Sequence, residues 1–236
     1  MADQYWTVSQ LWKYPIKSCK GTQVSEARIA VHGMERDRQF MIVDAKTGMF
    51  AAQRADSGLG IGIKSMCLIN AEIKGDPGTE RIEVSAPGME TITIYPDMFI
   101  PVGGRQRQVQ VWKSECDALI ADADTNQWFT EFLSRERPGK YQLVKFPYRA
   151  TRRAKHGYSQ LRYADGYPFL VISQESLDDL NKRIGGVRLP INRFRPNIVI
   201  TRGRPYDEDR LDRMVINGVD FEGMELCVRC PITIEN

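Results

Sequence analysis

The chain has 236 residues, of which 42% are hydrophobic and 27% charged, so it is long enough for one large domain or two small ones, each with its own core. The net charge of +3 is too small to predict nucleic acid as the main partner. No apolar run approaches the roughly 18 residues that a membrane span needs, and residues 1–6 lack the basic and apolar regions of a secretory signal.

The first half of the chain has the pattern of short strands. Aliphatic and aromatic runs predict strands at residues 8–12, 27–31, 39–43, 49–51, 68–73, 81–84, 91–95 and 108–112. Turns that contain Gly or Pro separate several of these runs. Many short strands with this punctuation predict a barrel or a sandwich.

The composition changes near residue 122, where we place the boundary between a domain over residues 1–121 and a second domain over residues 122–236. Asp124 or Thr125 is expected to cap a helix. Its apolar face comprises Trp128, Phe129, Phe132 and Leu133. The basic stretch 148–156 is expected to form a loop.

A second set of elements follows in the C-terminal part. The apolar run 169–172 predicts a strand, and Ser173 is a natural N-cap for a helix over residues 174–184. Further β segments are expected at residues 198–200, 214–216 and 221–226. The chain is therefore expected to have a mixed α/β, β-rich fold.

The five cysteines are Cys19, Cys67, Cys116, Cys227 and Cys230. Their odd number and wide spacing favour reduced thiols and a cytoplasmic location. A zinc site at Cys227 and Cys230 would need two more ligands, and His32 and His156 are not suitably spaced. A redox dithiol is expected early in an α/β unit, not near Pro231. The pair could pack as small hydrophobes, or a thiolate beside Arg229 could bind a soft metal.

Four segments combine groups that bind anions. Residues 14–21 carry two lysines, a hydroxyl and a glycine, and residues 36–38 carry two arginines. Ser173 is expected at a helix N-terminus, where free backbone N–H groups and the helix dipole favour anions. Residues 193–197 add two guanidinium groups and an amide. Together they predict a site for a ligand with a phosphate and several polar ring atoms.

Six segments follow one another along the chain in a recognisable order. They are Tyr-Pro-Ile-Lys-Ser-Cys-Lys-Gly (14–21), Arg-Asp-Arg-Gln-Phe (36–40), Ala-Gln-Arg (52–54), Pro-Phe-Leu-Val-Ile-Ser (168–173), Arg-Phe-Arg-Pro-Asn-Ile-Val (193–199) and Cys-Val-Arg-Cys (227–230). In this order they resemble the MOSC family, and in particular its amidoxime-reducing members. The resemblance covers nearly the whole chain. It implies a MOSC N-terminal β-barrel-like domain followed by a MOSC β-barrel domain with flanking helices.

The resemblance also implies a molybdenum cofactor (Mo-molybdopterin) and not pyridoxal phosphate. Cys230 would be the catalytic residue and the metal ligand, with Cys227 as a neighbour. The implied cofactor-binding residues are Lys17, Ser18, Cys19, Arg38, Arg54, Ser173, Arg193, Arg195 and Asn197. Residues 207–209 match an acidic stretch of the family and are expected to form a surface loop.

Two departures from the family shape the expected partners. Family members commonly continue for some tens of residues beyond the Cys-x-Arg-Cys segment, so the second domain is expected to be shortened or completed differently. Some bacterial relatives carry a C-terminal iron–sulfur domain, but this chain has no further cysteine cluster. Its electrons are therefore expected from a separate flavin reductase or iron–sulfur protein.

The expected function is reduction of a small N-hydroxylated or N-oxygenated substrate by this cofactor, for which the sequence indicates no obvious general acid. The alternative is a non-catalytic carrier of the cofactor or of its sulfur. A third reading, an RNA-binding module that uses residues 149–155, lacks the interleaved surface aromatic residues expected for base stacking. We therefore expect neither nucleic acid nor a membrane as a partner.

Overall fold

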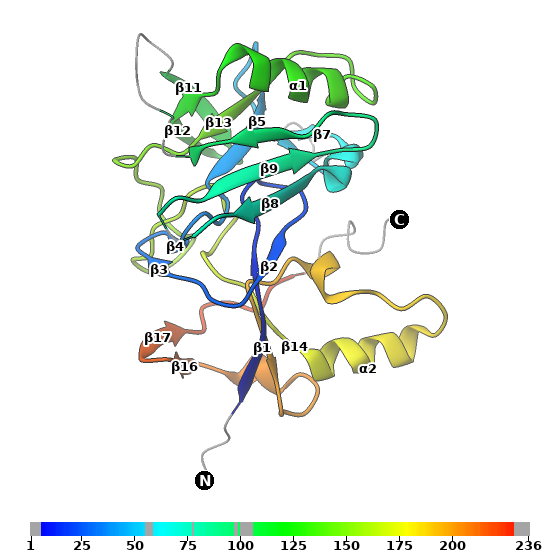
Figure 1. Ribbon diagram of the computed structural model, residues 1–236. Helices are drawn as coiled ribbons and strands as arrows, with labels where there is room; N and C mark the ends of the chain where they lie inside the picture. The colour runs from blue at the N-terminus through cyan, green and yellow to red at the C-terminus, as the bar shows by residue number, and fades with distance from the viewer. Residues whose placement is uncertain (1–5, 55–58, 77, 97–98, 100–105, 229–236) are drawn as a thin grey trace. The chain divides into compact units, whose positions relative to one another are not determined.

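The computed structural model describes residues 6–54, 59–76, 78–96, 99 and 106–228 (Figure 1). They form two compact units, each built from separated parts of the chain. Unit 1 comprises Met1–Trp12, Gln23–Ala27 and Phe169–Asn236, and unit 2 comprises Lys13–Thr22 and Arg28–Pro168. The fold is rich in strands, which confirms the predicted fold class. The domain boundary predicted between residues 121 and 122 stays a prediction.

Unit 2 is built mainly from antiparallel strands. They are β3 (Ile29–Ala30), β4 (Gly33–Met34), β5 (Phe40–Asp44), β6 (Ala51–Ala52), β7 (Ile61–Gly62), β8 (Asn70–Lys74), β9 (Arg81–Ser85), β10 (Ile92–Ile94), β11 (Gln106–Val111), β12 (Ser114–Ile120) and β13 (Tyr141–Lys145). One sheet has the order β11-β12-β13-β5 and another the order β10-β9-β8. The short pairs β3–β4 and β6–β7 complete the unit, and β6–β7 is parallel.

Strand β5 is buried on both faces and separates two apolar cores. Phe40 and Ile42 belong to one core, and Met41 and Val43 to the other. This follows from the period of two in a strand, where successive side chains point to opposite faces. The strand predicted at 39–43 is therefore correct, and the strand predicted at 68–73 is β8, preceded by the 3-10 helix η1 (Lys64–Leu68). Strands β12 and β13 were not predicted.

Helix α1 (Ala123–Leu133) packs against β13. Its buried side chains, Trp128, Phe129, Phe132 and Leu133, are the predicted apolar face. The predicted cap is wrong. Asp122 is the N-cap, and its carboxylate accepts hydrogen bonds from the backbone N of Thr125 at 2.8 Å and from the Thr125 hydroxyl at 2.8 Å.

We expect Asp122→Ala to lower the free energy of unfolding by about 1 kcal/mol, because it leaves an N-terminal N–H of α1 without its acceptor. The matched control is Asp124→Ala, which removes a carboxylate from the same turn but no capping bond. Urea denaturation of both variants measures the difference. Equal losses of stability would contradict the assignment of Asp122 as the cap.

Unit 1 contains a four-stranded sheet with the order β14-β15-β1-β2. Its strands are β1 (Thr7–Lys13), β2 (Thr22–Val24), β14 (Val171–Ser173) and β15 (Ile198–Thr201), of which Lys13 and Thr22 are assigned to unit 2. Strand β14 pairs with β15 in parallel, and β1 pairs with β15 antiparallel. The strand predicted at 169–172 begins two residues later, at Val171.

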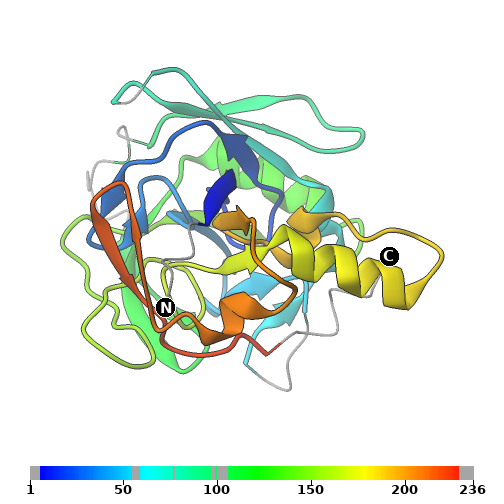
Figure 2. The same ribbon diagram turned by 90° about the horizontal axis from the view of Figure 1, so that it is seen from below.

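Helix α2 (Gln174–Ile184) lies alongside β14 and β15 in unit 1 (Figure 2). Ser173 caps it, as predicted: its hydroxyl accepts a hydrogen bond from the backbone N of Ser176 at 3.1 Å. The remaining elements are the 3-10 helices η3 (Ile191–Phe194) and η4 (Asp207–Arg210) and the hairpin of β16 (Arg213–Ile216) and β17 (Val219–Glu222).

Candidate functional site

Unit 2 gathers two cations on one indole ring. Lys17 is buried, and its backbone N bonds the carbonyl oxygen of Phe40 at 2.8 Å. Its Nζ lies 5.8 Å from the centre of the Trp112 ring. The guanidinium group of Arg54 lies 4.9 Å from the same centre. These distances are typical of cation–π contacts, so the structure brings two of the predicted cofactor-binding residues together on Trp112.

Asp165 is the counter-ion of Lys17. The Lys17 ammonium group donates to Asp165 Oδ1 and to the backbone oxygen of Tyr163, the latter at 3.0 Å. The indole N–H of Trp112 donates to the same Asp165 oxygen at 2.7 Å. Within the part of unit 2 that the structure describes, these bonds use two of the three N–H groups of Lys17, and the third remains for a ligand.

The charges around Asp165 keep it ionised. Burial raises the pKa of its carboxyl group, but the charge and hydrogen bond of Lys17, the Trp112 N–H and the Arg38 charge outweigh burial and hold that pKa well below its ordinary value. Burial is also the largest influence on Lys17 and lowers its pKa, while Asp165 acts in the opposite direction. Because 68% of the Asp165 side chain is exposed, its polar contacts outweigh the effect of burial on this carboxyl group. Asp165 is therefore a carboxylate at neutral pH and not a general acid.

Arg152 fixes the segment that carries Asp165. Its buried guanidinium group donates to the backbone oxygens of Arg162 at 3.0 Å, Ala164, and Asp165 at 3.0 Å. The backbone N of Tyr163 bonds the oxygen of Arg38 at 3.0 Å. These bonds hold residues 162–165 against the segment that contains Arg38, and so determine where the Asp165 carboxylate lies.

Arg38 and Ser18 are held at the edge of the same cluster. The Arg38 guanidinium group lies 4.4 Å from the centre of the Tyr14 ring, and its Nη1 donates to both carboxylate oxygens of Asp37, at 2.8 and 2.6 Å. The backbone oxygen of Ser18 accepts a hydrogen bond from Gln53, the neighbour of Arg54, at 2.6 Å. The predicted segments 14–21, 36–40 and 52–54 are thus joined in unit 2.

The backbone of this cluster suits an anion. Among the unit 2 residues that the structure describes, the non-glycine residues with positive φ are Ser18 (67°), Arg36 (66°), Arg38 (41°) and Trp112 (54°). Such residues are uncommon and concentrate at functional sites. Left-handed residues also turn successive backbone N–H groups toward one concave point, where anions bind. All four lie in the predicted segments or contact them, so the cluster fits an anionic cofactor with a planar ring system.

Cys19 has a different environment from its neighbours. Its side chain is fully buried in an apolar core that also contains Ile16 and Phe40. A thiol in such a place packs as a small hydrophobe. Its observed role is therefore packing beneath the loop of residues 14–21.

The α2 N-terminus of unit 1 already holds a carboxylate. The backbone N of Ser173 donates to Glu208 Oε1 at 3.1 Å, and its hydroxyl donates to Glu208 Oε2 at 2.9 Å. Glu208 belongs to η4, in the stretch that was expected to be a surface loop. An anion is what a helix N-terminus prefers, and here the chain itself supplies one.

Asn197 joins parts of unit 1 through its side chain and backbone. Its Nδ2 donates to the backbone oxygen of Trp12 at 3.2 Å, and its Oδ1 accepts from the backbone N of Leu170 at 3.3 Å. Arg195 has a φ of 56° at the end of η3, which also contains Arg193. Asn197 is therefore a structural link between β1 and the segment before β14.

The terminal cysteine pair is described only in part. Cys227 is exposed, and Arg229 and Cys230 lie outside the described residues. Among the residues that the structure describes, no group of three or more His, Cys, Asp or Glu side chains is arranged to hold a metal ion. In the same part of the chain, no helix has the length and apolar character needed to cross a membrane.

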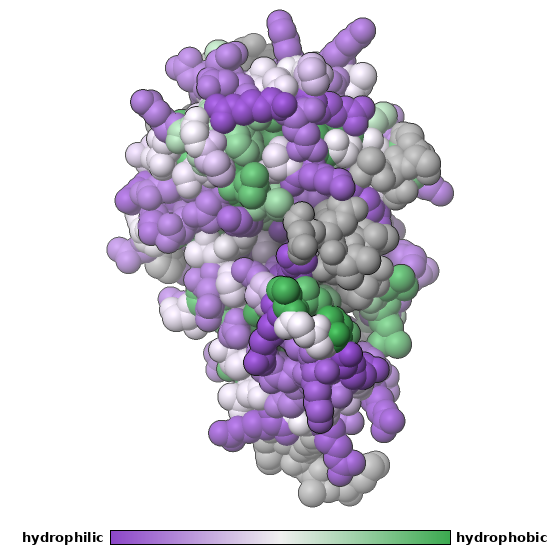
Figure 3. Space-filling model, turned by 90° about the vertical axis from the view of Figure 1, so that its right-hand side faces the viewer, coloured by the Kyte–Doolittle hydropathy of each residue, from purple (hydrophilic) through white to green (hydrophobic). Residues whose placement is uncertain are grey.

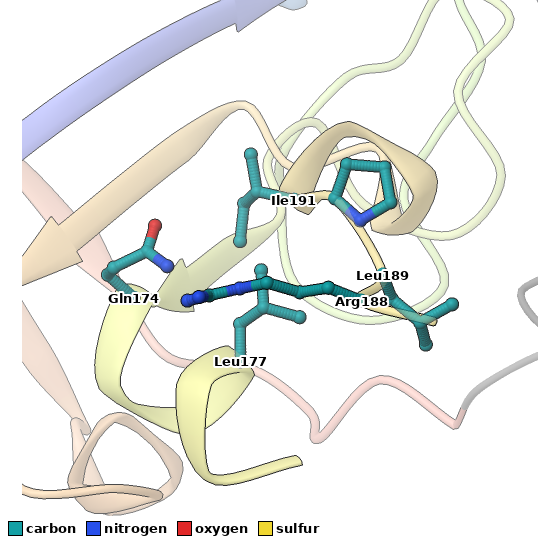
Figure 4. Close-up of a pocket in the computed structure, with 6 residues that line it drawn as sticks. Gln174, Leu177, Arg188, Leu189 and Ile191 are labelled. Carbon is teal, nitrogen blue, oxygen red and sulfur yellow. The ribbon is translucent and has the colours of Figure 1, made fainter. Parts of the chain in front are cut away.

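Unit 1 contains a small pocket. It lies between α2 and the segment before η3, with a volume of about 230 Å³. Leu177 and Ile191 line it, and the Arg188 side chain extends across it toward Gln174 (Figure 4). Ligand sites usually exceed roughly 300 Å³, so we assign this pocket no function.

The sequence alone missed three residues of the unit 2 cluster, Trp112, Arg152 and Asp165. Arg152 was included only in a basic loop, and Trp112 only at the end of a strand. A signal for Asp165 was present, because residues 137–164 contain no Asp or Glu and Asp165 is the first acid after that run. An acid in this position is a candidate counter-ion for a buried cation.

Comparison with known proteins agrees with the segments noted in the sequence. Residues 5–136 match the MOSC N-terminal beta barrel domain, and residues 159–235 match the MOSC domain. The chain is 31% identical to human mitochondrial amidoxime-reducing component 1, over 99% of this chain and 67% of the relative. It is 31% identical to mitochondrial amidoxime reducing component 2 of Bos taurus, over 98% of this chain and 66% of the relative. It is 26% identical to molybdenum cofactor sulfurase of Oryza sativa subsp. japonica, over 93% of this chain and 27% of the relative.

Proposed function

Because the chain belongs to the MOSC family, we propose that it binds a molybdenum cofactor and reduces N-hydroxylated or N-oxygenated compounds with electrons from a separate donor protein. The observation that carries the proposal is the unit 2 cluster, in which Lys17 and Arg54 meet on Trp112. The chain spans about two thirds of the length of its amidoxime-reducing relatives, so substrate and donor are part of the proposal. The cytoplasmic location expected from the cysteines stays a prediction.

The proposal gives the residues of unit 2 distinct tasks. Arg54 and Trp112 offer a flat, cationic and aromatic surface for a planar ring. The remaining N–H group of Lys17, the Arg38 guanidinium and the left-handed backbone at Ser18 offer donors to a phosphate. Asp165 sets the position and charge of Lys17. In unit 1, Arg193, Arg195 and the Ser173–Glu208 contact are the candidate contacts, and binding at Ser173 would displace Glu208.

The reaction consumes two electrons and two protons per turnover. The N–O bond of R–NH–OH breaks, and the products are R–NH₂ and water. When bound, the molybdenum cofactor supplies the two-electron redox chemistry, and Cys230 is the proposed protein ligand of the metal. Because Asp165 is ionised at neutral pH, we propose that the protons come from solvent and not from this carboxyl group.

A second candidate function is a carrier of the cofactor or of its sulfur. The match to molybdenum cofactor sulfurases over 93% of the chain favours it, as does the exposed thiol of Cys227. A carrier binds and releases the cofactor without reducing any substrate. The two functions therefore differ in turnover and agree in cofactor binding.

The test uses the full chain produced in a molybdenum-replete host. Molybdenum analysis and pterin fluorescence measure cofactor content, and reduction of a hydroxylamine with a chemical reductant measures turnover. We expect both cofactor and turnover. Cofactor without turnover would replace the reductase by the carrier, and a chain that contains no molybdenum would overturn both.

A further inference from the structure

Residues 148–160 of unit 2 form a loop, here named the tongue, that carries cations and exposed aromatic rings. Tyr148 and Tyr158 are 97% and 101% exposed. Arg149, Arg153 and Lys155 are also exposed. Residues 149–155 contain no aromatic residue, as noted from the sequence, and the two exposed tyrosines lie just outside that stretch. The face drawn in Figure 3 is mostly hydrophilic, with apolar side chains in small separate areas.

The base of the tongue is well anchored. Ala154, Leu161 and Ala164 form a small apolar core of their own. The backbone N of Ala154 bonds the oxygen of Ser159 at 2.9 Å, and the N of Leu161 bonds the oxygen of Arg152 at 2.6 Å. An exposed tyrosine on an anchored loop loses little conformational entropy on binding, and tyrosine and arginine are the residues that dominate protein interfaces.

The charge of the tongue selects the chemistry of its partner. No Asp or Glu lies anywhere in residues 137–164. Thr151, Arg153, Tyr158 and Gln160 line a depression of about 190 Å³ on the tongue. A guanidinium group with hydroxyl and amide neighbours matches a carboxylate in hydrogen bonding, and the depression has room for a single side chain. An acidic protein surface fits both the charge and the depression.

The tongue is also directly linked to the unit 2 cluster. Arg152 begins the bonds that position Asp165, and the backbone N of Lys155 bonds the oxygen of Gly166 at 3.0 Å. A protein bound to the tongue therefore lies beside the residues proposed to hold the cofactor. We propose that the tongue is the docking surface for an acidic face of the electron-donor protein. This inference rests on the proposed function for the identity of the partner as an electron donor.

The test measures binding of the full chain to poly-L-glutamate, a protein-like polyanion, at an ionic strength of about 0.15 M, where exposed charges more than roughly 8 Å apart are largely screened. We expect the triple variant Arg149→Glu, Arg153→Glu and Lys155→Glu to bind about tenfold or more weakly than the wild type, because each reversal replaces attraction by repulsion. The matched control is Lys46→Glu, Lys64→Glu and Lys140→Glu, three exposed cations of unit 2 with the same change in net charge. We expect the control to stay within about twofold of the wild type, because its charges lie off the tongue.

Three outcomes would overturn the inference. Equal losses in the two triple variants would mean that binding follows net charge alone. Tighter binding to oligo(dT) than to an abasic strand of equal charge, lost in Tyr158→Ala, would identify a nucleic-acid surface. Binding to phosphatidylserine vesicles but not to poly-L-glutamate would identify a membrane surface. Poly-L-glutamate binding needs no molybdenum, so this test can succeed or fail independently of the cofactor and turnover measurements.

Discussion

Cys230→Ala is expected to lower the molybdenum content of the purified protein by about tenfold or more, since even the loss of a group that only supports a metal ligand costs metal sites 10- to 100-fold in affinity. Sulfur is the donor that a soft metal prefers, and alanine offers no replacement. The pterin content is expected to fall less than the molybdenum content, because the proposed contacts of Lys17, Arg38 and Arg54 do not involve this thiol. Metal analysis and pterin fluorescence on the same samples measure the two losses.

Cys227→Ala is the control for Cys230→Ala. Both substitutions remove a thiol from the same tetrapeptide, and Cys227 is exposed, so its loss has little effect on packing. We expect Cys227→Ala to keep the wild-type molybdenum content. Equal molybdenum in wild type and Cys230→Ala would refute the ligand assignment, and a loss in Cys227→Ala alone would move that assignment to Cys227.

The parts of the fold that were predictable are those with a local cause. The helix of residues 174–184 follows from the Ser173 cap and the spacing of its apolar residues, and β5 follows from an uninterrupted apolar run. Strands β12 and β13 were missed because their stability comes from pairing. Strand β13 pairs with β5, which lies much earlier in the chain, with Tyr141 opposite Asp44 and Lys145 opposite Phe40. That register is set by contacts distant in sequence, which a local pattern does not contain.

The site shows the same division. Lys17 and Arg38 stand in segments whose cationic character alone suggested an anion site, and Arg54 was implied by the family resemblance. The residues that position them are distant in sequence: 146 residues separate Lys17 from its acceptor Tyr163. Trp112 and Asp165 have no motif of their own, and only the fold makes them partners. Cation placement was therefore predictable from the sequence, and the charge balance of the cluster was not.

Asp165→Asn is expected to lower the free energy of unfolding at pH 7 by about 2 kcal/mol, because it leaves the buried Lys17 ammonium group without its counter-ion. Breaking a fully buried ion pair costs more, roughly 3–5 kcal/mol, and we reduce that figure because the Asp165 side chain is 68% exposed. Lys17→Met should lower the free energy of unfolding by less, since it leaves only a solvated carboxylate without its partner. The double variant Lys17→Met, Asp165→Asn should have about the same free energy of unfolding as Lys17→Met alone. Urea denaturation of the four proteins completes the double-mutant cycle.

The pH dependence of Asp165→Asn has a definite sign. In wild type, the folded-state pKa of Asp165 is depressed. The ionised carboxylate therefore contributes fully to the free energy of unfolding above its unfolded pKa of about 3.9, and this contribution is lost as pH falls toward the folded value.

In Asp165→Asn, burial lowers the pKa of Lys17, and no Asp165 charge opposes this effect. At a pH between this lowered folded-state pKa and the unfolded-state lysine pKa of about 10.4, Lys17 is protonated in the unfolded chain but not in the folded chain. The free energy of unfolding of the variant therefore rises with pH in this range. The difference in free energy of unfolding between wild type and Asp165→Asn should therefore become smaller at both acidic and alkaline pH. A deficit that stays constant from pH 3 to pH 10 would mean that Asp165 stabilises the fold through packing or hydrogen bonds alone, and not through the charge of Lys17.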